Sequence, residues 1–428
     1  MLHLTRRKMF SASAINGGGF MLASLATVLW YFLIVKYYPG EASGQMLLSL
    51  SVAGLINLLD LGVSLGLVSV LSAGNEISGR HSRWDYVSSA LVVTTLNELL
   101  VGSLAVGWWK STSFPSLPDI GYFSIVIFAV STQAILLSNS AFKGLCDFKA
   151  ANLIMTGSTV AVYGVGVGAV LIGKNVWIVF LAMACIQLLA ACCAVVYANK
   201  RLRAQAAGEI ISASESIFVV YADLLRISVK FYPQMFTGIF FMHAQRFIIA
   251  RYSGLNAVAV ISFAYSIATR IHSVVNAFLE VIFPMARQLM VQGVNPNVFC
   301  VRVGTLSAAA YFAVALIVSG VASLLVPGIF LPLITYSIGV MFAVAVAPAF
   351  HLLNGSGESF QVSICSLLSP LIFLGLAPIL HSYLTVGSEI LLPIAYSLTM
   401  AVMLLQVALL VRRHSRRIIL ASLHQSTT

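Results

Sequence analysis

The chain has 428 residues, of which 60% are hydrophobic and only 9% are charged, against about 25% charged residues in a typical soluble domain. This composition excludes a soluble protein, because too few polar groups would keep it dissolved, and the lipid bilayer must surround most of the chain. The 24 Lys and Arg residues outnumber the 13 Asp and Glu residues. We attribute this excess to basic residues that flank membrane helices, so no nucleic-acid partner is expected.

The N-terminal residues Met1–Lys8 are basic, and an apolar run follows them to about Tyr38 without a convincing cleavage site. We therefore expect a retained first membrane helix and not a signal peptide. A spanning helix needs about 20 apolar residues, and the sequence offers such runs along its whole length, which predicts an all-α integral membrane fold. The twelve predicted spans lie near 15–37, 43–71, 87–109, 120–143, 152–173, 175–198, 231–251, 255–281, 302–326, 328–353, 360–382 and 388–411.

The basic residues predict the orientation of these helices. With both termini in the cytoplasm, Arg246 and Arg270 fall inside helices, and nearly all other Lys and Arg residues fall in inner segments. Such a bias fixes the topology of multi-pass proteins of an inner, or plasma, membrane. The exceptions in outer segments are Lys36, Lys110, Lys174 and Arg251.

The longest polar stretch divides the chain into two predicted lobes. Residues 1–203 form an N-lobe with helices one to six, and 231–412 form a C-lobe with helices seven to twelve. Residues 204–230 form a cytoplasmic linker with an amphipathic helix from about Ile217 to Val229, and 413–428 form a basic cytoplasmic tail.

The two lobes carry weak internal similarity. Phe32–Tyr37 after the first helix matches Phe247–Tyr252 after the seventh at an offset of 215, and Ala141–Leu145 echoes Ala349–Leu353. Six helices per half preserve orientation, so the repeats would be parallel and related by an axis along the membrane normal. This arrangement predicts a substrate path between the halves around a central cavity.

No motif of an enzyme, a cofactor site or a metal site is present. We find no Walker A sequence, no GxSxG, no HExxH and no GxGxxG that opens a dinucleotide fold. The six cysteines include no CxxC pair. We therefore expect no catalytic residue, no cofactor and no metal, and the energy source would be a gradient or the flow of substrate.

Polar residues at membrane depth are the informative ones, because each should face a cavity or a partner. In the second predicted helix, Ser49, Asn57, Asp60 and Ser64 would share one face. Gly62 and Gly66 beside them would allow close helix approach. Asp60 and Asn57 are candidates for the substrate cavity, and Asp60 also for ion coupling; the alternative is a structural ion pair or a helix cap.

Glu98 is the deepest acid in the sequence. It lies in the third predicted helix, about 16 Å from the inner end at 1.5 Å per residue. Glu98 is therefore a candidate for proton or ion coupling. The alternative is a carboxylate that is paired or hydrogen-bonded within its lobe.

The seventh and eighth predicted helices carry a cationic and polar stripe. We predict that Arg270, Arg246, His272 and Asn276 line a substrate cavity, because arginine forks match the geometry of phosphate and carboxylate groups. Glu280 is a further candidate for ion coupling. Alternatively, Arg246 extends outward to the membrane surface, and the histidines are simply hydrogen-bonded.

Several stretches resemble the Wzx-type flippases of O-antigen and exopolysaccharide repeat units, which belong to the MATE/MOP exporter superfamily. The likeness covers most of the chain in layout, length and lobe plan. One departure is Gln245, at a position where the family often has an acid before the arginine. The stretches that carry the resemblance are Leu58–Ser64, Ala141–Asn152, Leu225–Pro233 and Gln245–Ile249 with the helix that follows to Pro284.

The resemblance implies two six-helix bundles around a central cavity and alternating access by rocking of the lobes. It implies an undecaprenyl-pyrophosphate-linked oligosaccharide as substrate, moved from the cytoplasmic to the periplasmic leaflet of the bacterial inner membrane with coupling to an ion gradient. Membrane lipid would be a further partner, and a polysaccharide polymerase and a chain-length regulator are candidate partners.

Two other functions remain open at this point. A MATE-like antiporter of cationic drugs, driven by protons or sodium, predicts a cavity dominated by acids. An integral-membrane polymerase or glycosyltransferase predicts a long outer loop, whereas the predicted outer loops are short. The sequence favours the flippase, because its second half is rich in arginine and histidine.

Overall fold

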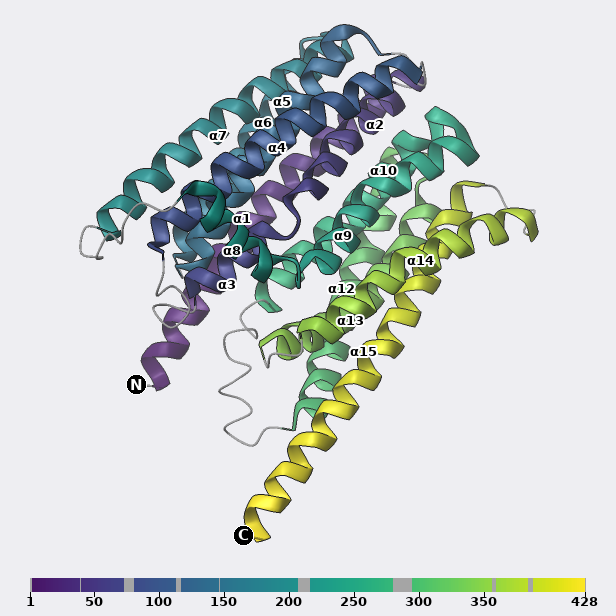
Figure 1. The fold of residues 1–428 in the computed structure, drawn as a ribbon. Coiled ribbons are helices and arrows are strands. Elements are labelled where there is room, and N and C mark those ends of the chain that lie inside the picture. The colour runs from purple at the N-terminus through teal and green to yellow at the C-terminus, as the bar shows by residue number, and fades with distance from the viewer. Residues whose placement is uncertain are drawn as a thin grey trace. The chain divides into compact units, whose positions relative to one another are not determined.

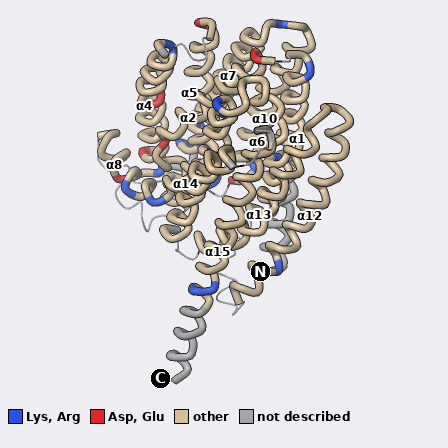
Figure 2. The backbone as a smooth tube through the Cα atoms, turned by 90° about the vertical axis from the view of Figure 1, so that its right-hand side faces the viewer, with Lys and Arg blue, Asp and Glu red and all other residues tan. Residues whose placement is uncertain are grey.

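The computed structural model of the protein describes residues 2–38, 40–72, 81–112, 117–145, 147–206, 216–279, 295–355, 359–383 and 388–427, and across these ranges its regular structure is entirely helical. Eleven helical segments within them are long and apolar enough to cross a membrane. One of these, Tyr232–Leu279, contains two of the predicted spans. Figure 2 shows that long stretches of the helices carry no charged residue. The all-α membrane fold is therefore confirmed.

The described residues form two compact units. We call Gly18–Ala259 the N-unit and Val260–Thr428 with Met1–Gly17 the C-unit. The predicted lobe boundary at 204–230 lies within the N-unit, which also contains the seventh predicted span. Residues 207–215 of the predicted linker lie outside the described part of the chain.

The N-unit contains the first membrane helices and a short helix that packs beside them (Figure 1). Its core joins apolar residues of several helices, among them Leu67, Leu137, Phe142 and Leu224. The helices are α1 (Leu2–Tyr37, from Gly18 onward), α2 (Glu41–Ile56), the 3-10 turn η1 (Asn57–Asp60), α3 (Val63–Ser72), α4 (Arg83–Thr112), α5 (Asp119–Gly144), α6 (Phe148–Leu171), α7 (Val176–Ala206), α8 (Ile217–Ser228), α9 (Tyr232–Ile239), the π-helical turn η3 (Phe240–Ala244) and the first part of α10 (Gln245–Leu279).

The amphipathic helix predicted near 217–229 is confirmed as α8. Val220, Leu224 and Ser228 are buried on one face at a spacing of four residues, and this face packs against α3 and α4. Phe218 and Arg226 lie on the exposed side. The apolar face alone explains the docking, because burial of aliphatic side chains is the main favourable contribution to helix packing.

The C-unit is built from the second part of α10 with α12 (Pro296–Leu325), α13 (Phe330–Gly355), α14 (Ser359–Tyr383) and α15 (Ser388–Thr427). Tyr265, Tyr336 and Tyr396 of α10, α13 and α15 pack edge to face, with ring centroids 5.1 to 5.7 Å apart. Such pairs exploit the quadrupole of the ring. The predicted tail from 413 continues the helix α15.

A glycine joint separates the seventh and eighth predicted helices. Gly254 has φ 79° and ψ 170° within α10, a conformation that residues with a side chain rarely adopt. The separation predicted between 251 and 255 is therefore confirmed at this glycine, five residues before the boundary between the two units.

Candidate functional site

The second predicted span is interrupted at Asp60. The α-helix α2 ends at Ile56, η1 covers Asn57–Asp60, and α3 begins at Val63. Between them Leu61 (φ 51°) and Gly62 (φ 82°) adopt left-handed conformations. The prediction of one unbroken helix over 43–71 with a continuous polar face is therefore wrong. The physical reason is a run of turn-forming residues, Asn, Asp and Gly, inside an apolar pattern.

Asp60 caps the helix that follows the interruption. The backbone N–H of Ser64 lies 3.2 Å from each of its two carboxylate oxygens. Asp60 is almost fully buried, and a carboxylate at a helix N-terminus is stabilised by the unpaired N–H groups and the helix dipole. Asp60 therefore caps a helix, which is one of the alternatives that the sequence left open, and it does so where the second predicted span is interrupted.

Glu98 of α4 has no exposed surface, and neither of its carboxylate oxygens has a hydrogen-bond partner. It lies within electrostatic range of Asp60. The Gln133 side chain of α5 lies beside Asp60 and is also fully buried. Asn57 adds a buried amide oxygen without a partner. We call Asn57, Asp60, Glu98 and Gln133 the polar cluster.

The helix α8 covers one side of this region. The Tyr221 hydroxyl lies within electrostatic range of Asp60 and Glu98 and 3.5 Å from Thr94 Oγ1 of α4. Tyr221 is partly buried, and the desolvation of its hydroxyl raises its pKa above the ordinary value. Its hydroxyl therefore stays a neutral donor near the two carboxylates.

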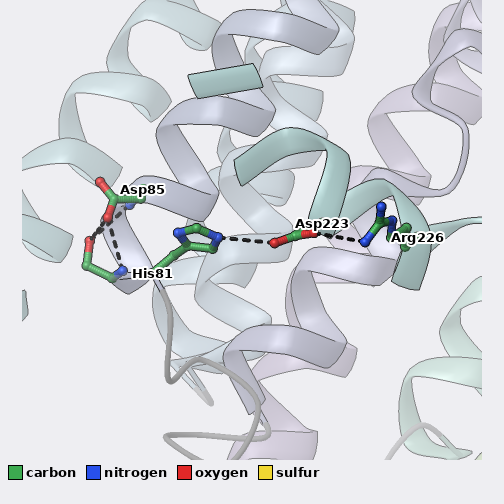
Figure 3. Close-up of polar contacts among 5 residues, drawn as sticks. His81, Asp85, Asp223 and Arg226 are labelled. Atoms are coloured by element: carbon green, nitrogen blue, oxygen red, sulfur yellow. Dashed lines mark hydrogen bonds and ion pairs between the residues drawn. The ribbon is translucent and has the colours of Figure 1, made fainter. Parts of the chain in front are cut away.

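A surface network fastens α8 to the start of α4 (Figure 3). His81 Nε2 lies 3.3 Å from one Asp223 oxygen, and Arg226 Nη1 lies 3.5 Å from the other. Ser82 caps α4 reciprocally: its hydroxyl donates to Asp85 Oδ2 at 2.8 Å and accepts from the Asp85 N–H at 3.2 Å. Of these contacts, the one between His81 and Asp223 joins α8 to the segment before α4, and it adds to the apolar packing of α8.

Arg246 is buried within the N-unit rather than extended to the membrane surface. Its guanidinium donates to the Leu47 carbonyl at 3.2 Å, to Ser51 Oγ at 2.9 Å and to the Tyr31 hydroxyl at 2.7 Å. It also stacks over the Tyr31 ring, 5.9 Å from the centroid. Among the described residues no carboxylate pairs with it. The geometry makes Arg246 a clamp that joins α10 to α1 and α2.

The seventh predicted span makes further contacts with α1 and α2 near Arg246. Tyr31 and Arg246 are 215 residues apart, which is the offset of the predicted repeat, so equivalent positions of the two halves contact each other. The ring of His243 packs so closely on Gly54 that a Cβ there would overlap it. The seventh span is thus fixed to α2 by a charged and an aromatic contact.

The remaining candidates lie in the C-unit on α10. Arg270 and His272 are half-buried, and Arg270 forms no hydrogen bond or ion pair with another described residue. Asn276 Oδ1 lies 3.2 Å from His351 Nε2 of α13. His272 lies within electrostatic range of the same His351. Glu280 lies outside the described residues.

The structure therefore divides the predicted site residues into separate groups. It brings Asp60 and Glu98 within electrostatic range of each other in the N-unit, with Asn57 three residues from Asp60, and on α10 it places His272 and Asn276, but not Arg270, near His351. Sequence reasoning missed Gln133, although a glutamine in an apolar span among Ser131, Ser138 and Asn139 was a usable signal. Within the described part of the chain, no group of three or more His, Cys, Asp or Glu side chains could hold a metal ion.

The described residues thus combine eleven candidate membrane spans with an interrupted second span and charged side chains inside helices. Comparison with solved structures identifies the fold. The chain matches an inward-facing multidrug resistance MATE transporter of the MOP superfamily with a TM-score of 0.65, at 15% identity over 95% of this chain and 98% of that one. A mutant of the Vibrio cholerae MATE transporter VcmN matches with a TM-score of 0.65, at 10% identity over 96% and 97% of the two chains.

A third similar structure is a MOP superfamily transporter from Pyrococcus furiosus, with a TM-score of 0.61 and 16% identity over 96% of each chain. For that protein, a reversed polarity of the binding pocket suggests a different function. The protein thus has the fold of the MATE/MOP transporters. No family model and no curated protein sequence matches the chain.

Proposed function

We propose that this protein is a flippase that moves a polyprenyl-pyrophosphate-linked oligosaccharide from the cytoplasmic to the periplasmic leaflet by alternating access. The observation that carries the proposal is Arg270, a half-buried guanidinium on a spanning helix that has no hydrogen bond or ion pair with another described residue. A charge in such a position marks a substrate path. Its fork of N–H donors suits a pyrophosphate or an acidic sugar.

The charge balance of the C-unit supports an anionic cargo. Residues 260–428 contain three acids, Glu280, Glu358 and Glu389, and none of them falls within a described span. The same residues contain seven arginines. A cationic drug would find no carboxylate in these spans, whereas an anionic head group finds Arg270 with His272 nearby.

A flippase of this kind removes a large barrier. Each sugar hydroxyl that enters hydrocarbon without a partner costs about 2–7 kcal/mol, so an oligosaccharide crosses an unassisted bilayer very slowly. Polar side chains such as Arg270 and Asn276 replace water around the head group while the lipid tail stays in the membrane. We place the protein in the inner membrane with both termini in the cytoplasm, as the distribution of basic residues predicts.

The test is a flipping assay in reconstituted vesicles with a fluorescent polyprenyl-pyrophosphate-linked oligosaccharide, in which a membrane-impermeant quencher reports the outer leaflet. The wild-type protein should accelerate exchange between leaflets. Arg270→Ala should slow it by at least about tenfold, because hydrogen bonds to charged groups contribute roughly 1.5–3 kcal/mol. Arg302→Ala is the matched control, because Arg302 is exposed at the start of α12. No acceleration by folded wild-type protein would overturn the proposal.

A second candidate function is an antiporter of cationic drugs, and a specific observation favours it. Several of the similar structures are multidrug MATE transporters, and the N-unit carries the buried acids Asp60 and Glu98. Efflux of a fluorescent cationic dye from cells that overproduce the protein distinguishes the two functions. Efflux that depends on Asp60 or Glu98, together with absent flipping, would favour the antiporter.

A further inference from the structure

The short helix α8 carries a second apolar stripe, which is exposed. Phe218, Ala222 and Val229 follow one another at spacings of four and seven residues, so they share one side of the helix. This side differs from the face that buries Val220 and Leu224 against α3 and α4. Phe218 is 67% exposed and Val229 is 55% exposed. Exposed apolar patches of this kind mark a surface for a partner or a membrane.

The contacts of α8 place it at the level of a membrane interface. The tryptophan pair 108–109 on α4 is typical of one membrane boundary, and a hydrocarbon core about 30 Å thick takes up roughly 20 helical residues. The other boundary therefore falls near Ser88. The helix α8, which lies beside α3 in Figure 1, contacts His81 before this level and Thr94 beyond it. Its exposed stripe is thus at the depth where interfacial helices insert apolar side chains.

Exposed basic residues accompany this stripe. Arg226 lies one helical turn after Ala222 and is 82% exposed. Lys230 follows one turn later, just after the end of α8, and is also exposed. Arg203 of α7 adds a further exposed cation, whose guanidinium lies 5.2 Å from the centre of the Trp84 ring near the start of α4. Basic residues beside an interfacial apolar stripe are typical of helices that bind anionic membranes.

The described acids near the same helix ends already have partners. Asp223 lies between the imidazole of His81 and the guanidinium of Arg226, 3.5 Å from the latter (Figure 3). Asp147 accepts a hydrogen bond from the first turn of α6. Asp85 forms a capping box at the start of α4. The surface around α8 therefore keeps an excess of positive charge, which attracts an anion.

We propose that α8 forms a binding surface for an anionic phospholipid of the bilayer. Phe218, Ala222 and Val229 would lie among the acyl chains, while Arg226 and Lys230 contact the phosphate. A guanidinium matches the geometry of a phosphate, and an ammonium adds a point charge. The occupant is a lipid of the bilayer and not the proposed cargo, because the exposed stripe needs acyl chains beside it whether or not cargo is bound.

The test measures lipid binding to the purified full-length protein by native mass spectrometry, with phosphatidylglycerol and phosphatidylcholine of the same acyl chains as probes. Wild-type protein should bind phosphatidylglycerol more tightly. Arg226→Gln combined with Lys230→Gln should weaken the tightest phosphatidylglycerol binding by roughly 25-fold, because each basic residue near an anionic surface contributes about fivefold. The matched control is Lys149→Gln combined with Arg302→Gln, which also removes two exposed cations but leaves α8 unchanged.

Thermal unfolding guards against a variant that simply fails to fold. Phosphatidylglycerol should raise the unfolding temperature of wild-type protein relative to phosphatidylcholine, because a ligand that binds the native state stabilises it. The double variant at Arg226 and Lys230 should unfold near the wild-type temperature in phosphatidylcholine and lose most of this rise. Phe218→Ser keeps both cations and should lose part of the rise, because it removes an apolar group from the acyl chains. High salt should reduce the rise in wild-type protein.

Three results would overturn the inference. One is equal affinity of folded wild-type protein for the two phospholipids. Another is an equal loss of affinity in the α8 double variant and its control, because net charge and not α8 would then attract the lipid. The third is displacement of phosphatidylglycerol from α8 by a polyprenyl-pyrophosphate-linked oligosaccharide, which would assign the surface to the cargo. Lipid binding requires no flipping, so its failure is distinguishable from failure of the proposed transport activity.

Discussion

The N-unit carries buried acids in its spanning helices, whereas the described spans of the C-unit contain none. In the N-unit, Asp60 and Glu98 are buried carboxylates that form no ion pair with a described cation. In the C-unit, Arg270 is half-buried without a described partner, and no acid lies within a described span. Because uncompensated charge is unfavourable in a membrane, the anionic cargo proposed above would be attracted by the guanidinium of the C-unit and repelled by the carboxylates of the N-unit.

Charge reversal at Arg270 should change the rate of flipping more than any other substitution considered below. Arg270→Glu should lower the rate of flipping of an anionic lipid-linked oligosaccharide by about a hundredfold, because like-charge repulsion replaces attraction and contributes several kcal/mol. The vesicle assay described above measures the rate. Flipping at the wild-type rate would show that the C-unit cation does not face the substrate.

Arg246 is the one buried arginine of the described N-unit, and unlike Arg270 it has hydrogen-bond partners among the described residues. Its three hydrogen bonds fix α10 to α1 and α2, so we expect a structural role. Arg246→Met should lower the free energy of unfolding by about 2 kcal/mol, measured by denaturant titration in detergent. The exposed Arg251 of the same helix supplies the control, Arg251→Met, which should change stability little. Equal effects of the two substitutions would contradict the clamp.

Much of this arrangement could be predicted from the sequence. Apolar runs predicted the membrane helices, and Gly254 separates the seventh and eighth spans where the pattern placed a boundary. The amphipathic pattern of 217–229 predicted α8. These features depend on local periodicity, which a single sequence contains.

The polar cluster and the clamp could not be predicted in this way. The interruption at Asn57–Gly62 is hidden because apolar residues continue on both sides of it. Whether Asp60 meets Gln133, or Arg246 meets Tyr31, depends on the register between packed helices, which tertiary contacts decide. The sequence could identify these residues as unusual for a membrane span, but not their partners.

The close packing of α3 against α8 provides a smaller test. A Cβ on Gly66 would overlap the Ser228 side chain and lie 3.0 Å from its Cα, so Gly66→Ala should destabilise the N-unit by about 1–3 kcal/mol through overpacking. Gly164→Ala on α6 meets no atom within 4 Å and serves as the control. An unfolding temperature that matches the control would show that α8 is loosely held.

The smallest effect is expected at the surface network of Figure 3. Asp223→Asn removes the negative charge that His81 and Arg226 contact, but Arg226 is 82% exposed, and partly exposed pairs contribute about 0–1 kcal/mol. The apolar face of α8, with Val220 and Leu224 buried, should therefore keep the helix docked, and the unfolding temperature should fall less than in Gly66→Ala. A larger fall in Asp223→Asn would mean that ion pairing, and not apolar burial, holds α8 over the carboxylates. In that case, raising the salt concentration should destabilise the wild-type protein by a similar amount, since exposed ion pairs are screened by salt.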